Sequence, residues 1–560
     1  MDGIEVPSEP QGGPSRWPLT ECAESCGLRF RHFNGMSGEL YFCETVGPGV
    51  ALFDYDSDGD LDVYAVQGRM LGPKARELAT FPPSEVGPCR DRLYRNELVP
   101  TGRLSFTDVT VEAGIVSEGY GMGAAVGDFD GDGHPDLFVT NFGPDLLLRN
   151  RGDGTFEDVT ARAGVGDDRW TTSAAFVDID RDGDLDLFVC AYVRFTLANH
   201  KPCYAPTTAR DYCGPLSYDP LPDRLYRNDG DGRFSDISAE SGISSASGSA
   251  LGVVCADFDG DGREDLFVAN DGMRNFLWLG DASGRFRDEA LLAGCAFNQD
   301  GVAEASMGVD AEDFDGDGDI DLFMTHLDSE TNTLYVNDGT ATFEDRSAAL
   351  GIGNPSRSFT GFGTAWFDLD NDGWLDLFCA NGAVKTIPAL AAKGDPYPLS
   401  QSNQLFHNEW GRSFADWSVR AGPALGVAEV SRGAAFGDLD NDGDVDIVVA
   451  NNSGPLRLLR NDLGQEASWI GLMALRSEDR YDLGARIEVR TERGAPIWRS
   501  VRRAASYCSS NDPRRVIGLT DRGAVLAVRV HWTDGSCEEW TEPRPERYHR
   551  LIRGAGRRVD

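Results

Sequence analysis

The feature that most constrains this chain is a nine-residue acidic motif, D-x-D-x-D-G-x-x-D, which occurs seven times. The copies begin at Asp54, Asp128, Asp178, Asp257, Asp313, Asp368 and Asp438. Carboxylates two residues apart, followed by a glycine, describe a loop that curls its oxygens around a hard cation. Many oxygen ligands in a flexible loop suit Ca²⁺ better than Mg²⁺, which requires strict octahedral geometry. One acidic turn is often merely solvated, but seven matching copies predict about seven bound Ca²⁺ ions.

Each loop offers side-chain oxygens at positions one, three, five and nine, and a backbone carbonyl at position seven. The predicted metal ligands are Asp54, Asp56, Asp58, Asp60, Asp62; Asp128, Asp130, Asp132, His134, Asp136; Asp178, Asp180, Asp182, Asp184, Asp186; Asp257, Asp259, Asp261, Arg263, Asp265; Asp313, Asp315, Asp317, Asp319, Asp321; Asp368, Asp370, Asp372, Trp374, Asp376; and Asp438, Asp440, Asp442, Asp444, Asp446. His134 and Trp374 are compatible with position seven, because only the backbone oxygen is used there.

The main alternative for such a loop is an EF-hand, which needs a bidentate glutamate at position twelve. Position twelve is instead occupied by Ala65, Val139, Val189, Val268, Met324, Cys379 and Val449. None of these side chains can bind calcium, so the EF-hand is excluded in every copy. The loop must close at position nine, and strand-like sequence follows it.

The acidic loop belongs to a longer repeat, whose copies start 50 to 79 residues apart. A strand of small and apolar residues precedes the loop, and a second strand follows it. A third strand ends in asparagine, as at Asn150, and a fourth follows a glycine-rich turn. Four short strands per unit form one sheet, and seven sheets arranged radially predict an all-β, seven-bladed β-propeller. An open solenoid is the alternative, but it would need capping units, and none is evident.

The repeat also predicts the domain boundaries. Residues 1–16 read as a disordered leader, and residues 17–464 as the propeller. Residues 17–28 resemble a fourth strand without its first three, so we expect them to complete the last blade. Residues 465–555 break the repeat and predict a small β domain with its own core. Three insertions, at 67–91, 194–223 and 383–403, fall between second and third strands, which places them on the face opposite the acidic loops.

Composition limits the partners and the location. The 560 residues carry a net charge of −40, which disfavours nucleic acid and anionic membranes as partners. No apolar run is long enough to span a membrane, and the first residues lack the pattern of a signal peptide. As written, the chain is expected in the cytoplasm, or outside the cell if a leader has been removed. The oligomeric state is left open.

The twelve cysteines give no zinc signature. Cys190, Cys255 and Cys379 are expected to be buried thiols. The pairs Cys203–Cys213 and Cys22–Cys26 are close enough in sequence to form disulfides in an oxidising compartment.

Taken together, the repeats and the tail resemble a known family. The repeats look like the FG-GAP/VCBS type. The tail is similar to the ASPIC/UnbV domain through four segments: 483–486, 509–511, 518–519 and 531–535. This order of domains resembles the cartilage acidic protein family, and the lack of a leader favours its bacterial branch. The tail departs from the expected pattern at Trp532-Thr533, where Trp-Pro is expected.

The resemblance leaves two functions open. The first is a calcium-binding propeller that holds a small-molecule ligand on the face opposite the calcium loops. The alternative is a calcium-dependent cyclase, or another enzyme that forms carbon–carbon bonds in natural-product biosynthesis of the enediyne type. No hydrolase, kinase or dehydrogenase motif is present. The candidate catalytic residues are Glu44, Asp271 and His326 for proton transfer, and Arg357 and Arg432 for holding a carbonyl or carboxylate oxygen.

Overall fold

The computed structural model describes residues 17–83, 88–205, 209–520 and 522–559, so the expected leader at 1–16 lies outside the described residues. Within these ranges, seven antiparallel four-stranded sheets repeat one pattern, and we number them sheet 1 to sheet 7 in chain order. Their strands, in order within each sheet, are β2 (Val50–Phe53), β3 (Asp62–Ala65), β4 (Arg92–Asn96), β5 (Phe106–Asp108); β6 (Gly121–Gly127), β7 (Asp136–Asn141), β8 (Leu146–Asn150), β9 (Phe156–Asp158); β10 (Thr171–Val177), β11 (Asp186–Ala191), β14 (Arg224–Asn228), β15 (Phe234–Asp236); β16 (Ala250–Ala256), β17 (Asp265–Asn270), β18 (Phe276–Gly280), β19 (Phe286–Asp288); β20 (Val309–Glu312), β21 (Asp321–Met324), β22 (Thr333–Asn337), β23 (Phe343–Asp345); β24 (Gly361–Phe367), β25 (Asp376–Asn381), β26 (Gln404–Asn408), β27 (Phe414–Asp416); and β28 (Ser431–Gly437), β29 (Asp446–Asn451), β30 (Arg457–Asn461), β1 (Leu19–Glu21).

The sheets are arranged around a common axis, as in a β-propeller. The first strands of successive sheets contact one another in the order β2, β6, β10, β16, β20, β24 and β28, and β28 in turn contacts β2. These strands are rich in small residues because they pack closely at the axis. At Gly123, for example, an added Cβ would lie 2.8 Å from the carbonyl oxygens of Thr172 and Cys508. The predicted all-β propeller class is confirmed.

The N-terminal strand lies in the last sheet. β1 pairs antiparallel with β30, with Leu19 opposite Asn461 and Glu21 opposite Leu459. Sheet 7 is thus built from both ends of the ring, in the position where the sequence analysis expects residues 17–28.

Short helices and one hairpin lie between the strands. They are α1 (Leu98–Thr101), α2 (Thr160–Ala163), α3 (Ala290–Ala293), α4 (Gly353–Ser356), α5 (Pro388–Ala391) and the hairpin of β12 (Cys203–Tyr204) and β13 (Arg210–Asp211). The hairpin is bridged by a Cys203–Cys213 disulfide, whereas Cys22 and Cys26 are free thiols. None of the helices in the described ranges is both long and apolar enough to span a membrane.

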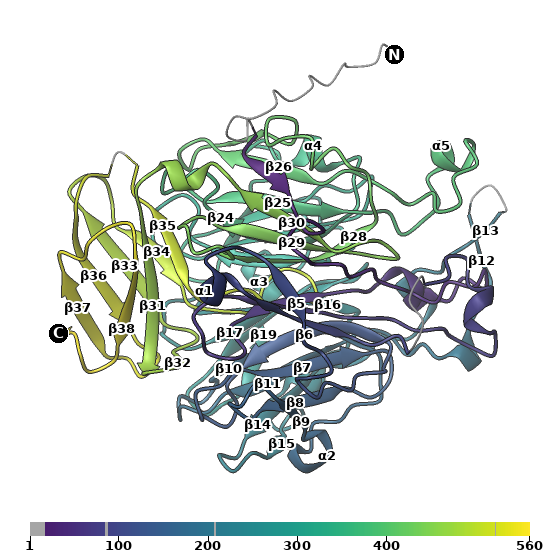
Figure 1. The fold of residues 1–560 in the computed structure, drawn as a ribbon, viewed down its shortest axis with the longest axis horizontal. Helices are drawn as coiled ribbons and strands as arrows, with labels where there is room; N and C mark the ends of the chain where they lie inside the picture. The colour runs from purple at the N-terminus through teal and green to yellow at the C-terminus, as the bar shows by residue number, and fades with distance from the viewer. Residues whose placement is uncertain (1–16, 84–87, 206–208, 521, 560) are drawn as a thin grey trace.

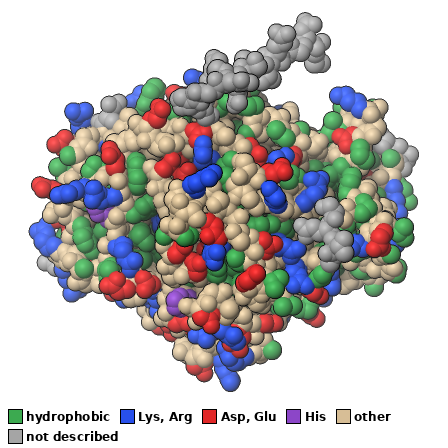
Figure 2. All heavy atoms as spheres, viewed as in Figure 1, with side chains coloured by type: hydrophobic (Ala, Val, Ile, Leu, Met, Phe, Trp, Pro, Cys, Tyr) green, Lys and Arg blue, Asp and Glu red, His purple; other side chains and the backbone are tan. Residues whose placement is uncertain are grey.

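The C-terminal residues form two further sheets. One contains β31 (Trp469–Ser477), β32 (Arg480–Tyr481), β35 (Arg515–Gly518) and β38 (Tyr548–Ile552); the other contains β33 (Arg486–Thr491), β34 (Ile497–Ser500), β36 (Val525–His531), β37 (Cys537–Thr541) and β39 (Arg557–Arg558). Figure 1 shows these yellow strands on one side of the ring, and α5 with the β12–β13 hairpin on the other side. On the face that Figure 2 shows, acidic and basic side chains are interspersed rather than gathered into patches of one sign.

The C-terminal region does not have a separate core, which corrects the sequence-based expectation. One buried cluster joins Phe129 and Leu185 of the ring to Ile470 and Leu472 of β31. The sequence suggested independence because the repeat ends near residue 464. The apolar face of β31 is nevertheless buried partly against the ring.

A segment of the C-terminal region, residues 501–513, inserts among the first strands of the ring, and nearly all of it is buried. Its backbone and side chains form hydrogen bonds with six of these strands: Ser510 with Val50 and Leu52 of β2, Cys508 with Ala124 of β6 and Ser173 of β10, Ser506 with Val309 of β20 and Thr364 of β24, and Asn511 with Phe436 of β28. We call residues 501–513 the axial segment, because it fills the space between the first strands.

Candidate metal centres and crown residues

Each acidic loop connects the first and second strands of its sheet, and its first aspartate organises the turn. In the second loop, the two carboxylate oxygens of Asp128 each accept a hydrogen bond at 3.1 Å, from the backbone N–H groups of Asp132 and Gly133. Gly133 has φ +91°, a conformation that favours glycine. This requirement explains why every copy of the motif has glycine at position six.

The ninth aspartate joins the loop to the rest of its sheet. Asp136 is buried and accepts hydrogen bonds from the backbone N–H of Phe129 at 3.1 Å and that of Asn150 at 2.7 Å. The same pair of bonds is made by Asp62, Asp186, Asp265, Asp376 and Asp446. These bonds fix the carboxylate beside the loop, where the sequence predicts that it completes the ligand shell.

The carboxylates converge as a cation site requires. Potential ligand atoms lie within 4.8 Å of one another in several loops: Asp54, Asp56 and Asp58; Asp128, Asp130 and Asp136; Asp178, Asp180 and Asp186; and Asp257, Asp259 and Asp265. A further group unites Asp370 and Asp372 with His407 of β26. The nine-residue motif gave no signal for His407, because it lies in the third strand.

All seven loops contain a buried carboxylate oxygen without a hydrogen-bond partner among the described residues. These oxygens belong to Asp56, Asp130, Asp178, Asp257, Asp321, Asp370 and Asp440. Burial, followed by repulsion from neighbouring aspartates, raises the pKa of Asp440 to about 7 and that of Asp368 to about 8. Buried acceptors that lack a donor and repel one another fit a bound divalent cation.

The C-terminal region contacts the acidic loops directly, which the sequence did not predict. Arg476 pairs with Asp178 at 3.0 Å, the hydroxyl of Tyr548 donates to Asp438 at 2.6 Å, and Arg514 donates to the carbonyl of Asp438 at 2.7 Å. The sheet that contains β31 and β38 therefore lies against the third and seventh acidic loops.

The three predicted insertions meet one another around Glu44, and we call this region the crown. Tyr212, from the second insertion, donates to the Oε2 atom of Glu44 at 2.9 Å. Tyr397, from the third insertion, packs against Phe81 of the first at 5.3 Å between ring centres. Glu44 is fully buried, its Oε1 atom has no partner among the described residues, and burial raises its pKa to about 8.

The side chain of Arg432 is occupied by backbone acceptors, one of which is the carbonyl of Thr45, the residue after Glu44. It is fully buried and donates to the carbonyls of Thr45, Gly382, Ser431 and Ala383 at 2.6 to 3.1 Å. Its guanidinium also stacks on Phe362, 4.0 Å from the ring centre. In this arrangement Arg432 ties the crown to sheets 6 and 7.

The other candidate residues are Asp271, His326 and Arg357. Asp271 accepts a hydrogen bond from the hydroxyl of Tyr192, and its backbone forms an isolated antiparallel β-bridge with Ala305. Burial raises the pKa of Asp271 to about 7. His326 lies 3.1 Å from the hydroxyl of Ser306, and burial lowers its pKa to about 3, so the imidazole is neutral. Arg357 is exposed after α4. Among the described residues, no hydrogen bond or ion pair joins the side chains of Glu44 and Arg432 or those of Asp271 and His326, so the five candidates do not form one site.

Comparison with known proteins agrees with this architecture. The FG-GAP-like repeat family matches residues 128–189, 216–268, 257–324 and 313–379, and the ASPIC and UnbV family matches residues 476–558. Cartilage acidic protein 1 of Homo sapiens is 26% identical over 310 residues, which are 54% of this chain and 43% of that protein. The Mus musculus protein is 25% identical over 54% of this chain and 44% of its own length. The matched stretch therefore spans less than half the length of these curated relatives.

One similar solved structure is an Agrocybe aegerita lectin that recognises non-reducing terminal N-acetylglucosamine. It has a TM-score of 0.37 and 14% identity, and it covers 73% of this chain and 87% of its own. The repeats and the tail, matched in this order, assign the architecture: the chain is an FG-GAP-repeat protein with a C-terminal ASPIC and UnbV domain.

Proposed function

We propose that this protein binds Ca²⁺ in its seven acidic loops and that the ions are part of the folded structure. The observation that carries the proposal is the buried carboxylate oxygen without a partner in every loop, among the residues that the structure describes. Each of these oxygens lies beside other aspartates of the same motif, so a cation would satisfy the acceptor and remove the repulsion. The flexible, all-oxygen ligand set favours Ca²⁺ over Mg²⁺.

Calcium removal should therefore destabilise the fold. A ligand at 100 times its dissociation constant stabilises the folded state by about 2.7 kcal/mol. Seven independent sites would together contribute roughly 19 kcal/mol, more than the roughly 5–15 kcal/mol that is typical of a whole domain. We expect a large fall in melting temperature in excess EGTA, measured by differential scanning calorimetry. An unchanged melting temperature would contradict the proposal.

A matched pair of variants tests the location of the ions. Asp315→Asn changes position three of the fifth loop and should lower the bound calcium, measured by elemental analysis after dialysis, by about one ion. Asp300→Asn makes the same change at an exposed aspartate outside the loops and should leave the calcium content unchanged. Equal calcium contents in the two variants would place the ions elsewhere.

A second candidate function is the cyclase-type catalysis that the family resemblance implies, and Glu44 is the observation that favours it. A buried carboxyl with a pKa of about 8 carries a proton at neutral pH, which is the protonation state that a general acid needs. Genes for natural-product biosynthesis beside this one would support the assignment. Product formation from their intermediates should then be lost in Glu44→Gln and retained in Asp300→Asn.

A further inference from the structure

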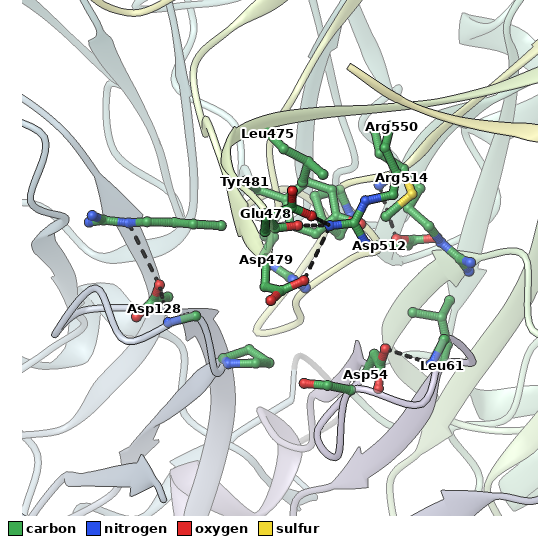
Figure 3. Close-up of a pocket in the computed structure, with 18 of the residues that line it drawn as sticks. Asp54, Leu61, Asp128, Leu475, Glu478, Asp479, Tyr481, Asp512, Arg514 and Arg550 are labelled. Carbon is green, nitrogen blue, oxygen red and sulfur yellow. Dashed lines mark hydrogen bonds and ion pairs between the residues drawn. The ribbon is translucent and has the colours of Figure 1, made fainter. Parts of the chain in front are cut away.

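A cavity of about 570 Å³ lies between the ring and the C-terminal region. Figure 3 shows Asp54 and Leu61 of the first acidic loop on one side, Asp128 of the second loop on another, and Leu475, Tyr481 and Asp479 of the C-terminal region facing them. Its volume and its place between the ring and the C-terminal region are typical of small-molecule sites. It lies on the loop face, opposite the crown to which the sequence analysis assigned the ligand.

The arginines that line this cavity differ in how they are paired. Arg514 pairs with Asp512 at 2.7 Å, Arg550 with Asp479 at 3.2 Å, and Arg480 lies 3.6 Å from Asp128. Arg503 is only 8% exposed and forms no ion pair within the described ranges of the chain. The carboxylates of Asp512 and Asp54 act on Arg503 only through space, without a direct ion pair. A buried cation without a direct ion pair is costly, so the donors of Arg503 require an explanation.

The surroundings of Arg503 leave its donors available. The one hydrogen bond that its guanidinium donates to the described residues is a long one, 3.4 Å to the carbonyl of Leu52. The guanidinium otherwise faces the ring of Tyr481, 5.6 Å from its centre. The hydroxyl of Tyr481 has no hydrogen-bond partner in the described ranges either, and both residues line the cavity. The guanidinium of Arg503 and the hydroxyl of Tyr481 thus line the same cavity, and the described residues leave hydrogen-bonding capacity unused on both.

One part of the lining suits an apolar molecular body. Leu61 and Leu185 come from the ring, and Met473, Leu475 and Leu483 come from the C-terminal region. We propose that the cavity binds a small molecule with an apolar body and a carboxylate, and that Arg503 and the Tyr481 hydroxyl hold the carboxylate. Arginine is suited to this role because its planar donors match a carboxylate in pairs.

The inference rests on the proposed calcium function, because acidic residues also border the cavity. Asp54, Asp58 and Asp128 belong to the first two calcium loops. Without cations their charge would repel a carboxylate, whereas bound Ca²⁺ would neutralise it. The calcium-loaded protein should therefore bind the ligand more tightly than the calcium-free protein.

Isothermal titration calorimetry with two probes tests the site. The probes are 1-naphthylacetate and its neutral amide, 1-naphthylacetamide, each added to the full chain in excess CaCl₂. Arg503→Met removes charge-assisted hydrogen bonds to the carboxylate, so it should weaken naphthylacetate binding at least about tenfold. Its effect on the amide should be less than about threefold, because the amide lacks the charge that Arg503 recognises. Tyr481→Phe removes only the hydroxyl and should also weaken naphthylacetate selectively.

Controls separate this inference from the calcium proposal. Arg412→Met removes an exposed charge that does not line the cavity and should leave both affinities unchanged. Tyr481→Phe provides the test if Arg503→Met fails to fold. The inference is overturned if the wild type binds neither probe or if both variants keep wild-type affinity for naphthylacetate. It is also overturned if the variants lose affinity for the acid and the amide equally. A calcium titration without probe is run in parallel. If calcium binds normally, any of these results overturns only the inference about the cavity. If calcium does not bind, the proposed calcium function is overturned as well.

Discussion

At the scale of single residues, an asparagine at the end of the third strand locks neighbouring sheets together. Six sheets have it: Asn96, Asn150, Asn228, Asn337, Asn408 and Asn461. The side-chain amide of Asn150 donates to the carbonyl of Pro135 in its own loop at 3.2 Å and to that of Tyr55 in the preceding loop at 2.7 Å. The other five make the same bond to the second residue of the preceding loop. Sheet 4 has Gly280 at this position.

This contact predicts a stability loss in Asn150→Ala. The substitution leaves the buried carbonyl of Tyr55 and the half-buried carbonyl of Pro135 without their donor, which costs about 1–3 kcal/mol. The lower free energy of unfolding should appear as a lower midpoint of urea unfolding, measured in excess calcium. Asn354→Ala, at an exposed asparagine, should shift stability by less than about 0.5 kcal/mol. Equal midpoints for the two variants would show that the lock contributes nothing.

Glu44 predicts a pH-dependent difference in stability. Burial raises its pKa from 4.5 to about 8, so proton binding favours the folded state. This contribution is fully present below about pH 4.5, is lost as the pH rises through about 8, and is absent from Glu44→Gln. The wild type should therefore lose melting temperature relative to the variant between about pH 5 and pH 9, by a few degrees. A difference that is constant with pH would contradict the buried, protonated state of Glu44.

At the scale of elements, β1 closes sheet 7 and covers the edge of β30. An uncovered strand edge pairs readily with other chains. Removing residues 1–28 should therefore cause aggregation, measured by light scattering and gel filtration, whereas removing residues 1–15 should leave the protein monodisperse. A soluble 29–560 protein with cooperative unfolding would refute the role of β1.

The elements also show what the sequence can predict. The acidic loops, the four-strand unit and the closing strand follow from local patterns that repeat, so they were accessible without coordinates. The axial segment 501–513 was not, because its partners are up to several hundred residues away and its own sequence has no strand or helix period. The cavity and the role of Arg503 could not be predicted either, because the lining residues are far apart in sequence and meet only in the folded chain. The third-strand asparagine was visible, but its partner is a backbone carbonyl, which leaves no mark in sequence.

At the scale of the whole molecule, the axial segment joins the ring and the C-terminal region into a single structural unit. Tyr507 lies at its centre, fully buried, with its hydroxyl donating to the carbonyl of Val46 at 2.9 Å and its ring 4.9 Å from that of Phe362. Because the segment bonds to six of the seven first strands, the C-terminal region cannot unfold without opening the centre of the ring. Two domains joined only by a linker would instead melt separately.

Calorimetry should therefore show one calcium-dependent transition for the full chain, and Tyr507→Ala should lower the whole of it. Removing a large buried aromatic side chain costs about 3–5 kcal/mol, and here the cost falls on both regions because Tyr507 touches the ring from the C-terminal region. Tyr204→Ala is the matched control, since Tyr204 is 65% exposed. Two resolved transitions, of which Tyr507→Ala shifts only one, would show that the axial segment does not couple the two regions.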